Sequence, residues 1–142
     1  MKKINYKQLI IAVAIPLLLG GGVGFLIKDA AKSYNGFIPG YIFPIVWTIL
    51  YILMGLVSYL VRDDKELLKT YSLNLVINFL WPIIFFLLKL RLLALIDLTI
   101  LIIIVIYMIR QFYKKNKLSS YLLIPYLLWL FVAFILNLVE LF

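Results

Sequence analysis

The three tryptophans of the chain, Trp47, Trp81 and Trp129, are the residues whose chemistry suggests a binding site. An indole ring offers a broad apolar face for stacking and an N–H group for one hydrogen bond. Trp81 and Trp129 lie well inside long apolar segments, whereas tryptophans that mark a membrane interface lie beside the flanking charges. Their positions favour a common aromatic pocket over interfacial belts and ordinary packing.

Each tryptophan lies at helical spacing from small, aromatic or amide-bearing residues, which therefore share its helix face. The three faces contain Pro44, Trp47, Thr48, Tyr51, Gly55 and Ser58; Asn74, Asn78, Trp81 and Phe85; and Pro125, Trp129, Ala133 and Asn137. Lipid offers no partner to an amide, so the asparagines must face protein or a cavity. The asparagines therefore either bind a ligand or form hydrogen bonds between helices.

The elements that position these residues are membrane spans. The chain of 142 residues is 66% hydrophobic, with a mean hydropathy of +1.13, whereas about half of a soluble domain is apolar. Apolar stretches of about 20 residues span a bilayer as helices. We expect five spans, and thus an all-α membrane protein in which residues 1–142 form a single bundle of five transmembrane helices. The spans are residues 6–27, 42–61, 67–88, 92–112 and 120–141.

The net charge of +8 comes from residues in the connections between spans, which argues against a nucleic-acid partner. The positive-inside rule predicts more lysine and arginine on the cytoplasmic side. Ten of these residues lie on the side of the N-terminus and four on the other side. This distribution predicts a multi-pass protein, in a bacterial cell membrane, with a cytoplasmic N-terminus and an external C-terminus.

The composition narrows the chemistry further. The chain has no cysteine and no histidine, which excludes disulfides and the usual zinc, copper and histidine-ligated haem sites, so no metal site is expected. It has neither a Ser–His–Asp set nor paired carboxylates within a span, so no catalytic residue is indicated. Asp97 lies inside the fourth span, where pairing with Lys89 or Arg91 would offset much of a cost of about 3 kcal/mol. A structural role is favoured for it over proton relay.

Gly20 and Gly24 form a GxxxG pair in the first span. Such a pair allows two helix backbones to approach closely. It predicts either tight packing within the bundle or the face of a homodimer.

Four segments together resemble the translocator protein family, also called the tryptophan-rich sensory protein or peripheral-type benzodiazepine receptor family. They are FPIVWTILYILMG at 43–55, NFLWPIIFF at 78–86, ALID at 94–97 and PYLLWLFVAFILN at 125–137. The resemblance implies a five-helix bundle that often dimerises and binds porphyrins such as protoporphyrin IX and haem. Animal members also bind cholesterol and synthetic drugs. The cholesterol motif is not carried over, because no basic residue follows Lys117.

The resemblance also implies which residues bind the ligand. They are Trp47, Tyr51, Asn78, Trp81, Trp129, Ala133 and Asn137, supported by Phe85, Phe86, Pro125 and Tyr126. The family's prolines and tryptophan before the second span are represented here by residues 38–41, which lack tryptophan, so the cover of the pocket is expected to differ.

Two classes of function follow, and a third stays open. The first is a tetrapyrrole-binding protein with a sensory, regulatory or transport role, in which porphyrin or haem is a ligand and not a required cofactor. Its ring would stack on tryptophan while its carboxylates reach Lys28, Lys32 or backbone N–H groups. The second is an enzyme that degrades porphyrin slowly by light-dependent oxidation, with Trp47 and Trp129 as redox partners. The third is a scaffold subunit of a membrane complex.

Overall fold

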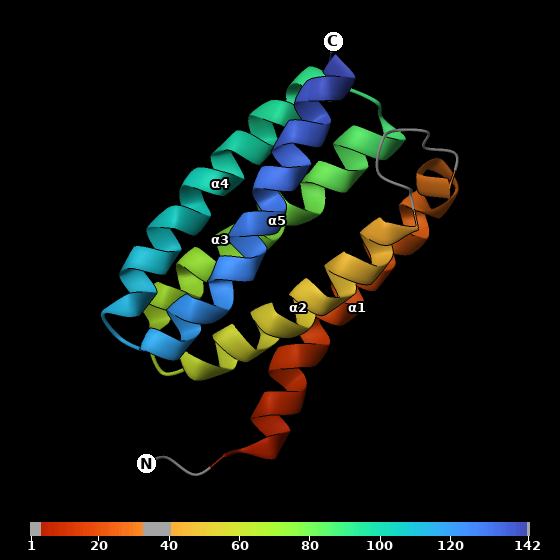
Figure 1. Ribbon diagram of the computed structural model, residues 1–142. Coiled ribbons are helices and arrows are strands. Elements are labelled where there is room, and N and C mark those ends of the chain that lie inside the picture. The colour runs from red at the N-terminus through yellow and green to blue at the C-terminus, as the bar shows by residue number, and fades with distance from the viewer. Residues whose placement is uncertain (1–3, 33–40, 142) are drawn as a thin grey trace.

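The computed structural model describes residues 4–32 and 41–141. These residues form five long helices, a single π-helical turn and no β-strand (Figure 1). The helices are α1 (Tyr6–Lys32), α2 (Ile42–Leu60), α3 (Lys65–Pro82), α4 (Arg91–Tyr113) and α5 (Lys117–Leu141), and the turn is η1 (Ile83–Leu87). All five helices, α3 together with η1, are long and apolar enough to cross a membrane. The predicted all-α bundle of five transmembrane helices is confirmed.

Helix α1 extends five residues beyond its predicted end at residue 27. The extension includes Lys28 and Lys32, which the hydropathy pattern assigned to a connection. Alanine favours helix at positions 30 and 31, and Lys32 in the last turn complements the negative end of the helix dipole. The polar segment after the first span therefore begins as helix. Its remainder, residues 33–40, lies outside the described residues.

Helix α3 begins at a cap and ends in a wider turn. The Asp64 carboxylate accepts hydrogen bonds from the backbone N–H groups of Glu66 and Leu67, at 3.0 and 3.2 Å. At the other end, Pro82 has no N–H for the regular ladder, and η1 follows it directly. This turn interrupts the continuous α-helix expected over 67–88, and both Phe85 and Phe86 are buried in it.

The helices pack unequally. Helix α4 packs against α5 and α3, and α2 bridges to α5, whereas α1 packs mainly on α2 with smaller contacts to η1 and α3. Figure 1 shows α1 and α2 together along one flank, with α4 and α5 on the other. Helix α1 is the least buried of the five spans.

Two kinds of contact attach the start of α1 to α2 and to the turn that follows α2. A side chain at Gly55 would overlap the backbone of Val13, so glycine there permits close helix approach. The Asn5 N–H donates to the Tyr59 hydroxyl at 2.7 Å, and the Arg62 Nε donates to Gln8 Oε1 at 3.0 Å. Pro16 lies three residues beyond Val13.

Candidate ligand-binding site

A cavity of about 630 Å³ lies between the C-terminal half of α1 and the N-terminal half of α2. Helix α1 contributes Gly20, Gly21, Gly24, Lys28 and Lys32; the α2 side contributes Tyr41, Phe43, Trp47, Thr48 and Tyr51; Pro82 and Phe86 close it from the third span. The walls are mainly apolar, and the two lysines lie toward one end of α1. A ligand of suitable shape would therefore have an apolar bed and a basic margin.

The glycines of α1 shape this cavity differently. A side chain at Gly20 would overlap the ring of Tyr51, so Gly20 supports close packing within the chain. Gly21 and Gly24 also line the cavity, but a Cβ atom at either one would meet no atom within 4 Å. Of the Gly20 and Gly24 pair, Gly20 thus packs against α2, whereas Gly24 forms part of the open cavity wall. A homodimer through this pair stays a prediction.

Trp47 links the cavity to an aromatic cluster in the bundle. Its ring stacks on Tyr51, with centroids 5.8 Å apart and an interplanar angle of 25°. It also contacts Trp81, at 6.3 Å, and the edge of Trp129, at 6.4 Å. The structure thus brings the tryptophans of three helices together, with Trp47 between the cavity and the other two.

Phe43 is a member of this cluster that sequence reasoning missed. Its ring makes edge contacts with Phe86, at 5.0 Å, and with Trp129, at 5.9 Å, and it lines the cavity. The signal that could have found it is its position four residues before Trp47, on the same helix face. Gly21 and Gly24 could also have indicated the cavity from the sequence, because helix positions without side chains leave space.

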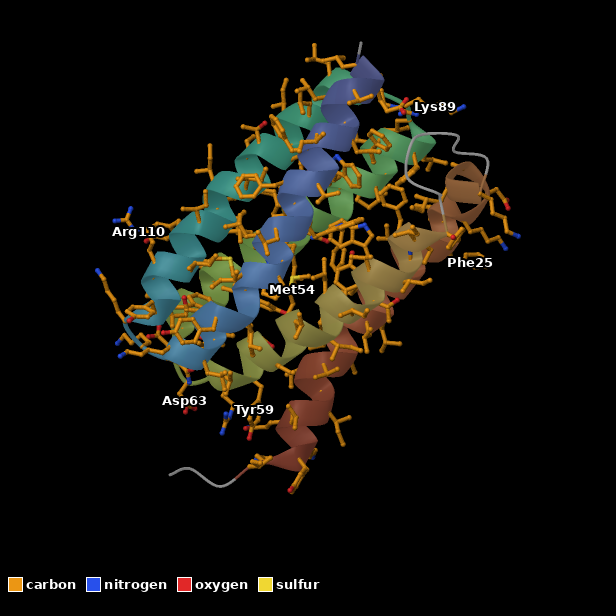
Figure 2. All side chains as sticks on the ribbon, in the orientation of Figure 1. Phe25, Met54, Tyr59, Asp63, Lys89 and Arg110 are labelled. Carbon is orange, nitrogen blue, oxygen red and sulfur yellow. The ribbon has the colours of Figure 1, made fainter. Side chains whose placement is uncertain are left out.

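A chain of buried hydrogen bonds continues from the cavity wall into the bundle. The Tyr51 hydroxyl donates to Asn78 Oδ1 at 3.0 Å, and Asn78 Nδ2 donates to the Tyr126 hydroxyl at 2.8 Å. Tyr126 in turn donates to Asn74 Oδ1 at 2.7 Å, and Asn74 Nδ2 lies 3.6 Å from the Met54 sulfur. Figure 2 shows Met54 in the bundle interior. The chain connects α2, α3 and α5, as hydrogen bonding between helices requires.

A second polar connection lies nearer the η1 end. The Trp81 Nε1 donates to Asn137 Oδ1 at 2.9 Å, and Asn137 Nδ2 donates to the backbone carbonyl of Arg91 at 2.9 Å. The Arg91 side chain lies 3.4 Å from Glu140 and over the ring of Phe85. Asn137 therefore holds α3, α4 and α5 together by partnering groups that lipid could not satisfy.

The residues predicted to bind ligand do not all line the cavity. Trp47, Tyr51 and Phe86 line it. Six others are buried behind it in the packed bundle, namely Asn78, Trp81, Phe85, Tyr126, Ala133 and Asn137. Trp129 is partly buried against Phe43 and Trp47, and Pro125 is exposed on α5. Most of the predicted set thus forms a support for the cavity wall.

Two tryptophan N–H groups and one carboxylate oxygen are buried without hydrogen-bond partners among the described residues. They are Trp47 Nε1, Trp129 Nε1 and Asp97 Oδ2. Asp97 forms no ion pair with Lys89 or Arg91 in the described part of the chain, and the Arg91 side chain lies against Glu140 near the end of α5. Within residues 4–32 and 41–141, no group of three acidic side chains could hold a metal ion.

The fold and site together define a class: a five-helix membrane protein with an aromatic-walled cavity beside a tryptophan cluster. Residues 12–140 match the model of the TspO/MBR family, and the chain belongs to that family. It is 32% identical to the tryptophan-rich protein TspO of Archaeoglobus fulgidus and 30% identical to that of Chlorobaculum tepidum, each over 94% of both chains. It is also 36% identical to a translocator protein homolog of Schizosaccharomyces pombe, over 70% of this chain and 66% of the relative.

Proposed function

We propose that this membrane protein binds a tetrapyrrole, porphyrin or haem, in the cavity between α1 and α2, in a sensory, regulatory or transport role. The observation that carries the proposal is the combination of cavity size and lining. A volume of about 630 Å³ falls within the range of small-molecule sites, about 300 to 1,000 Å³. The stacked pair of Trp47 and Tyr51 supplies a flat aromatic wall for a flat ring.

The polar groups of the cavity suit the periphery of such a ligand. Lys28 and Lys32 lie one turn apart on α1 and line the cavity, where they would attract the propionate carboxylates of a porphyrin. The Trp47 N–H is buried and lacks a partner among the described residues, so the indole ring would have to turn before a ligand acceptor could reach it. These contacts would orient the ring with its carboxylates toward the end of α1.

A cavity-filling substitution tests this proposal. Gly24→Phe should place a ring in the cavity without overlapping the protein, because a Cβ atom at Gly24 meets open space. Gly22→Phe is the matched control: Gly22 is also open, lies two residues away and does not line the cavity. We expect Gly24→Phe to weaken protoporphyrin IX binding at least about tenfold, measured by tryptophan fluorescence quenching, and Gly22→Phe to leave it unchanged. Equal affinity in both variants would place the ligand elsewhere.

The basic margin has its own test. Lys28→Gln with Lys32→Gln should weaken binding of a porphyrin with free carboxylates, and should have little effect on its dimethyl ester. Phe25 lies beside Lys28, whose ammonium group is 4.3 Å from the centre of the phenyl ring. Lys89→Gln is the control, since Lys89 lies toward the same end of the bundle as Phe25 but does not line the cavity (Figure 2). A loss that is the same for acid and ester would show that the lysines act on the fold and not on the carboxylates.

A second candidate function is oxidative degradation of the bound porphyrin, with dioxygen as oxidant. The edge contact between Trp47 and Trp129 favours it, because it would connect a cavity-lining indole to a second oxidisable ring. Trp47→Phe and Trp129→Phe should then abolish light-dependent bleaching of the porphyrin while binding persists, since phenyl still stacks but is much harder to oxidise. Equal bleaching in wild type, both variants and heat-unfolded protein would be ordinary photochemistry and would remove this candidate.

The proposal includes an orientation in a bacterial cell membrane, with the N-terminus in the cytoplasm. The start of α1 and the end of α5 lie toward opposite ends of the bundle in Figure 1, as five spans require. The excess of lysine and arginine at the N-terminal side supports placing that side inside.

A further inference from the structure

A second hollow lies far along the chain from the cavity, where α4 ends and α5 begins. It measures about 670 Å³ and is lined by Tyr107 and Arg110 of α4, by Lys114 directly after α4, and by Tyr121 and Ile124 of α5. None of these residues lines the cavity between α1 and α2. We call this hollow the α4–α5 groove. The α4–α5 groove shares none of these lining residues with the proposed tetrapyrrole site, so a ligand in the groove is a separate question.

The groove presents two cations that form no ion pair among the described residues. They are Arg110 and Lys114, which lie one helical turn apart. Lys115, next along the chain, lies 3.6 Å from Asp64 and is thus engaged with the turn before α3. Figure 2 shows the Arg110 side chain pointing outward from α4. Two adjacent positive charges are therefore available to one anionic group.

The surroundings of these cations suit a membrane interface. Tyr107 and Tyr121 are 57% and 53% exposed, and tyrosine is enriched where the headgroup region meets the hydrocarbon core. Beyond them, on the same faces of α4 and α5, Ile103 and Leu128 are 62% and 60% exposed. The surface thus changes from basic through aromatic to aliphatic over about two helical turns.

We propose that the α4–α5 groove is a binding site for an anionic phospholipid. Its phosphate lies between Arg110 and Lys114, its glycerol region lies beside Tyr107 and Tyr121, and its acyl chains follow the exposed aliphatic surface. The continuity of the charged and aliphatic parts selects a lipid over free phosphate, which would leave the aliphatic part unused. The clustered positive charge selects an anionic lipid over a zwitterionic one.

Native mass spectrometry of the full chain in detergent tests the site, with phosphatidylglycerol and phosphatidylcholine as probes. We expect the first phosphatidylglycerol to bind the wild type more tightly than phosphatidylcholine does. Arg110→Gln with Lys114→Gln should weaken it about tenfold, since each cation near an anionic headgroup contributes about a factor of five before screening. Phosphatidylcholine binding should stay unchanged.

Two matched variants separate the groove from general charge. Lys65→Gln with Lys69→Gln removes the same charge from exposed positions on α3, and should leave binding within about twofold of wild type. Arg110→Lys with Lys114→Arg keeps both charges in the groove and should also retain binding. An equal loss in the α3 variant, or no lipid preference in the wild type, would overturn the proposal.

Competition and salt complete the test without any variant. Added salt should weaken binding of phosphatidylglycerol but not of phosphatidylcholine. Inorganic phosphate at the same concentration as the lipid should not displace it. Displacement by inorganic phosphate would make the groove a simple anion site, and a cholesterol preference that survives loss of both cations would make it a sterol site; either result would overturn the assignment. Unchanged near-ultraviolet circular dichroism checks that the glutamine variants remain folded.

Discussion

The hydroxyl of Tyr51 donates to Asn78 Oδ1 across 3.0 Å, and this hydrogen bond joins the cavity wall to the buried polar chain of the bundle. The ring of the same tyrosine stacks on Trp47 and occupies the space that Gly20 leaves on α1. One side chain therefore connects the packing of α1, the aromatic wall and the interior of α3.

Tyr51→Phe should destabilise the protein by about 1 kcal/mol, the scale of one intramembrane hydrogen bond, because it leaves Asn78 Oδ1 without its donor. The measurement is the free energy of unfolding in mixed detergent micelles. Tyr6→Phe, at an exposed position, is the control and should change nothing. Equal stability of the two variants would mean that the bond contributes no net free energy.

Gly20→Ala and Gly24→Ala should have opposite effects. The methyl group at position 20 would overlap Tyr51 and force it to move, at a cost of about 1 to 3 kcal/mol, with some loss of any ligand that uses the Tyr51 wall. The methyl group at position 24 meets open space, and alanine favours helix by up to about 1 kcal/mol. Thermal unfolding of the two variants beside wild type measures both effects. A destabilised Gly24→Ala with an unaffected Gly20→Ala would contradict the packing of α1.

Asn137→Leu should destabilise the bundle by about 1 to 2 kcal/mol, because it leaves the Trp81 N–H and the Arg91 carbonyl without their partner. Asn78→Leu should be comparable, since it removes the partner of both Tyr51 and Tyr126. Unfolding free energies, together with porphyrin affinity, measure the outcome. Unchanged values in both variants would show that these amides do not hold the helices together.

A reporter fused after Phe142 should act outside the cytoplasm, because the span number is odd and ten of fourteen lysines and arginines lie on the N-terminal side. A phosphatase that is active only outside and a fluorescent protein that matures only inside provide the paired readout. Fluorescence without phosphatase activity would reverse the proposed orientation.

Hydropathy predicts the helices of this chain well because membrane thickness sets their length. The residue at which a helix ends is harder to predict where charged residues argue for a connection and helix propensity argues for continued helix. Residues 28–32 contain three charges yet continue α1, since a helix end can extend beyond the hydrocarbon region. The π-helical turn η1 follows from the backbone left unpaired by Pro82, and no hydropathy pattern reports it.

The candidate site was predictable in part. Helical spacing alone groups Trp47, Trp81 and Trp129 on polarised faces, and the structure brings their rings into contact. The same spacing does not say which rings pack and which leave space, because that depends on how side-chain volumes fit between helices. The cavity therefore lies toward α1, where Gly21 and Gly24 leave room, and not among the buried asparagines.

The unequal attachment of α1 has a mechanical consequence. Its N-terminal half is fixed to α2 at Val13 and at the polar contacts of Asn5 and Gln8, whereas its C-terminal half forms a wall of the cavity. Pro16 lies between the halves, where a missing N–H makes a helix easier to bend. Gly24 lies eight residues beyond Pro16, about 12 Å along the axis at 1.5 Å per residue. A bend of about 5° at Pro16 would carry Gly24 by about 1 Å and change the width of the cavity. Because Gly20 packs against the Tyr51 ring, the same bend would also act on the residue that begins the Tyr51–Asn78–Tyr126 chain.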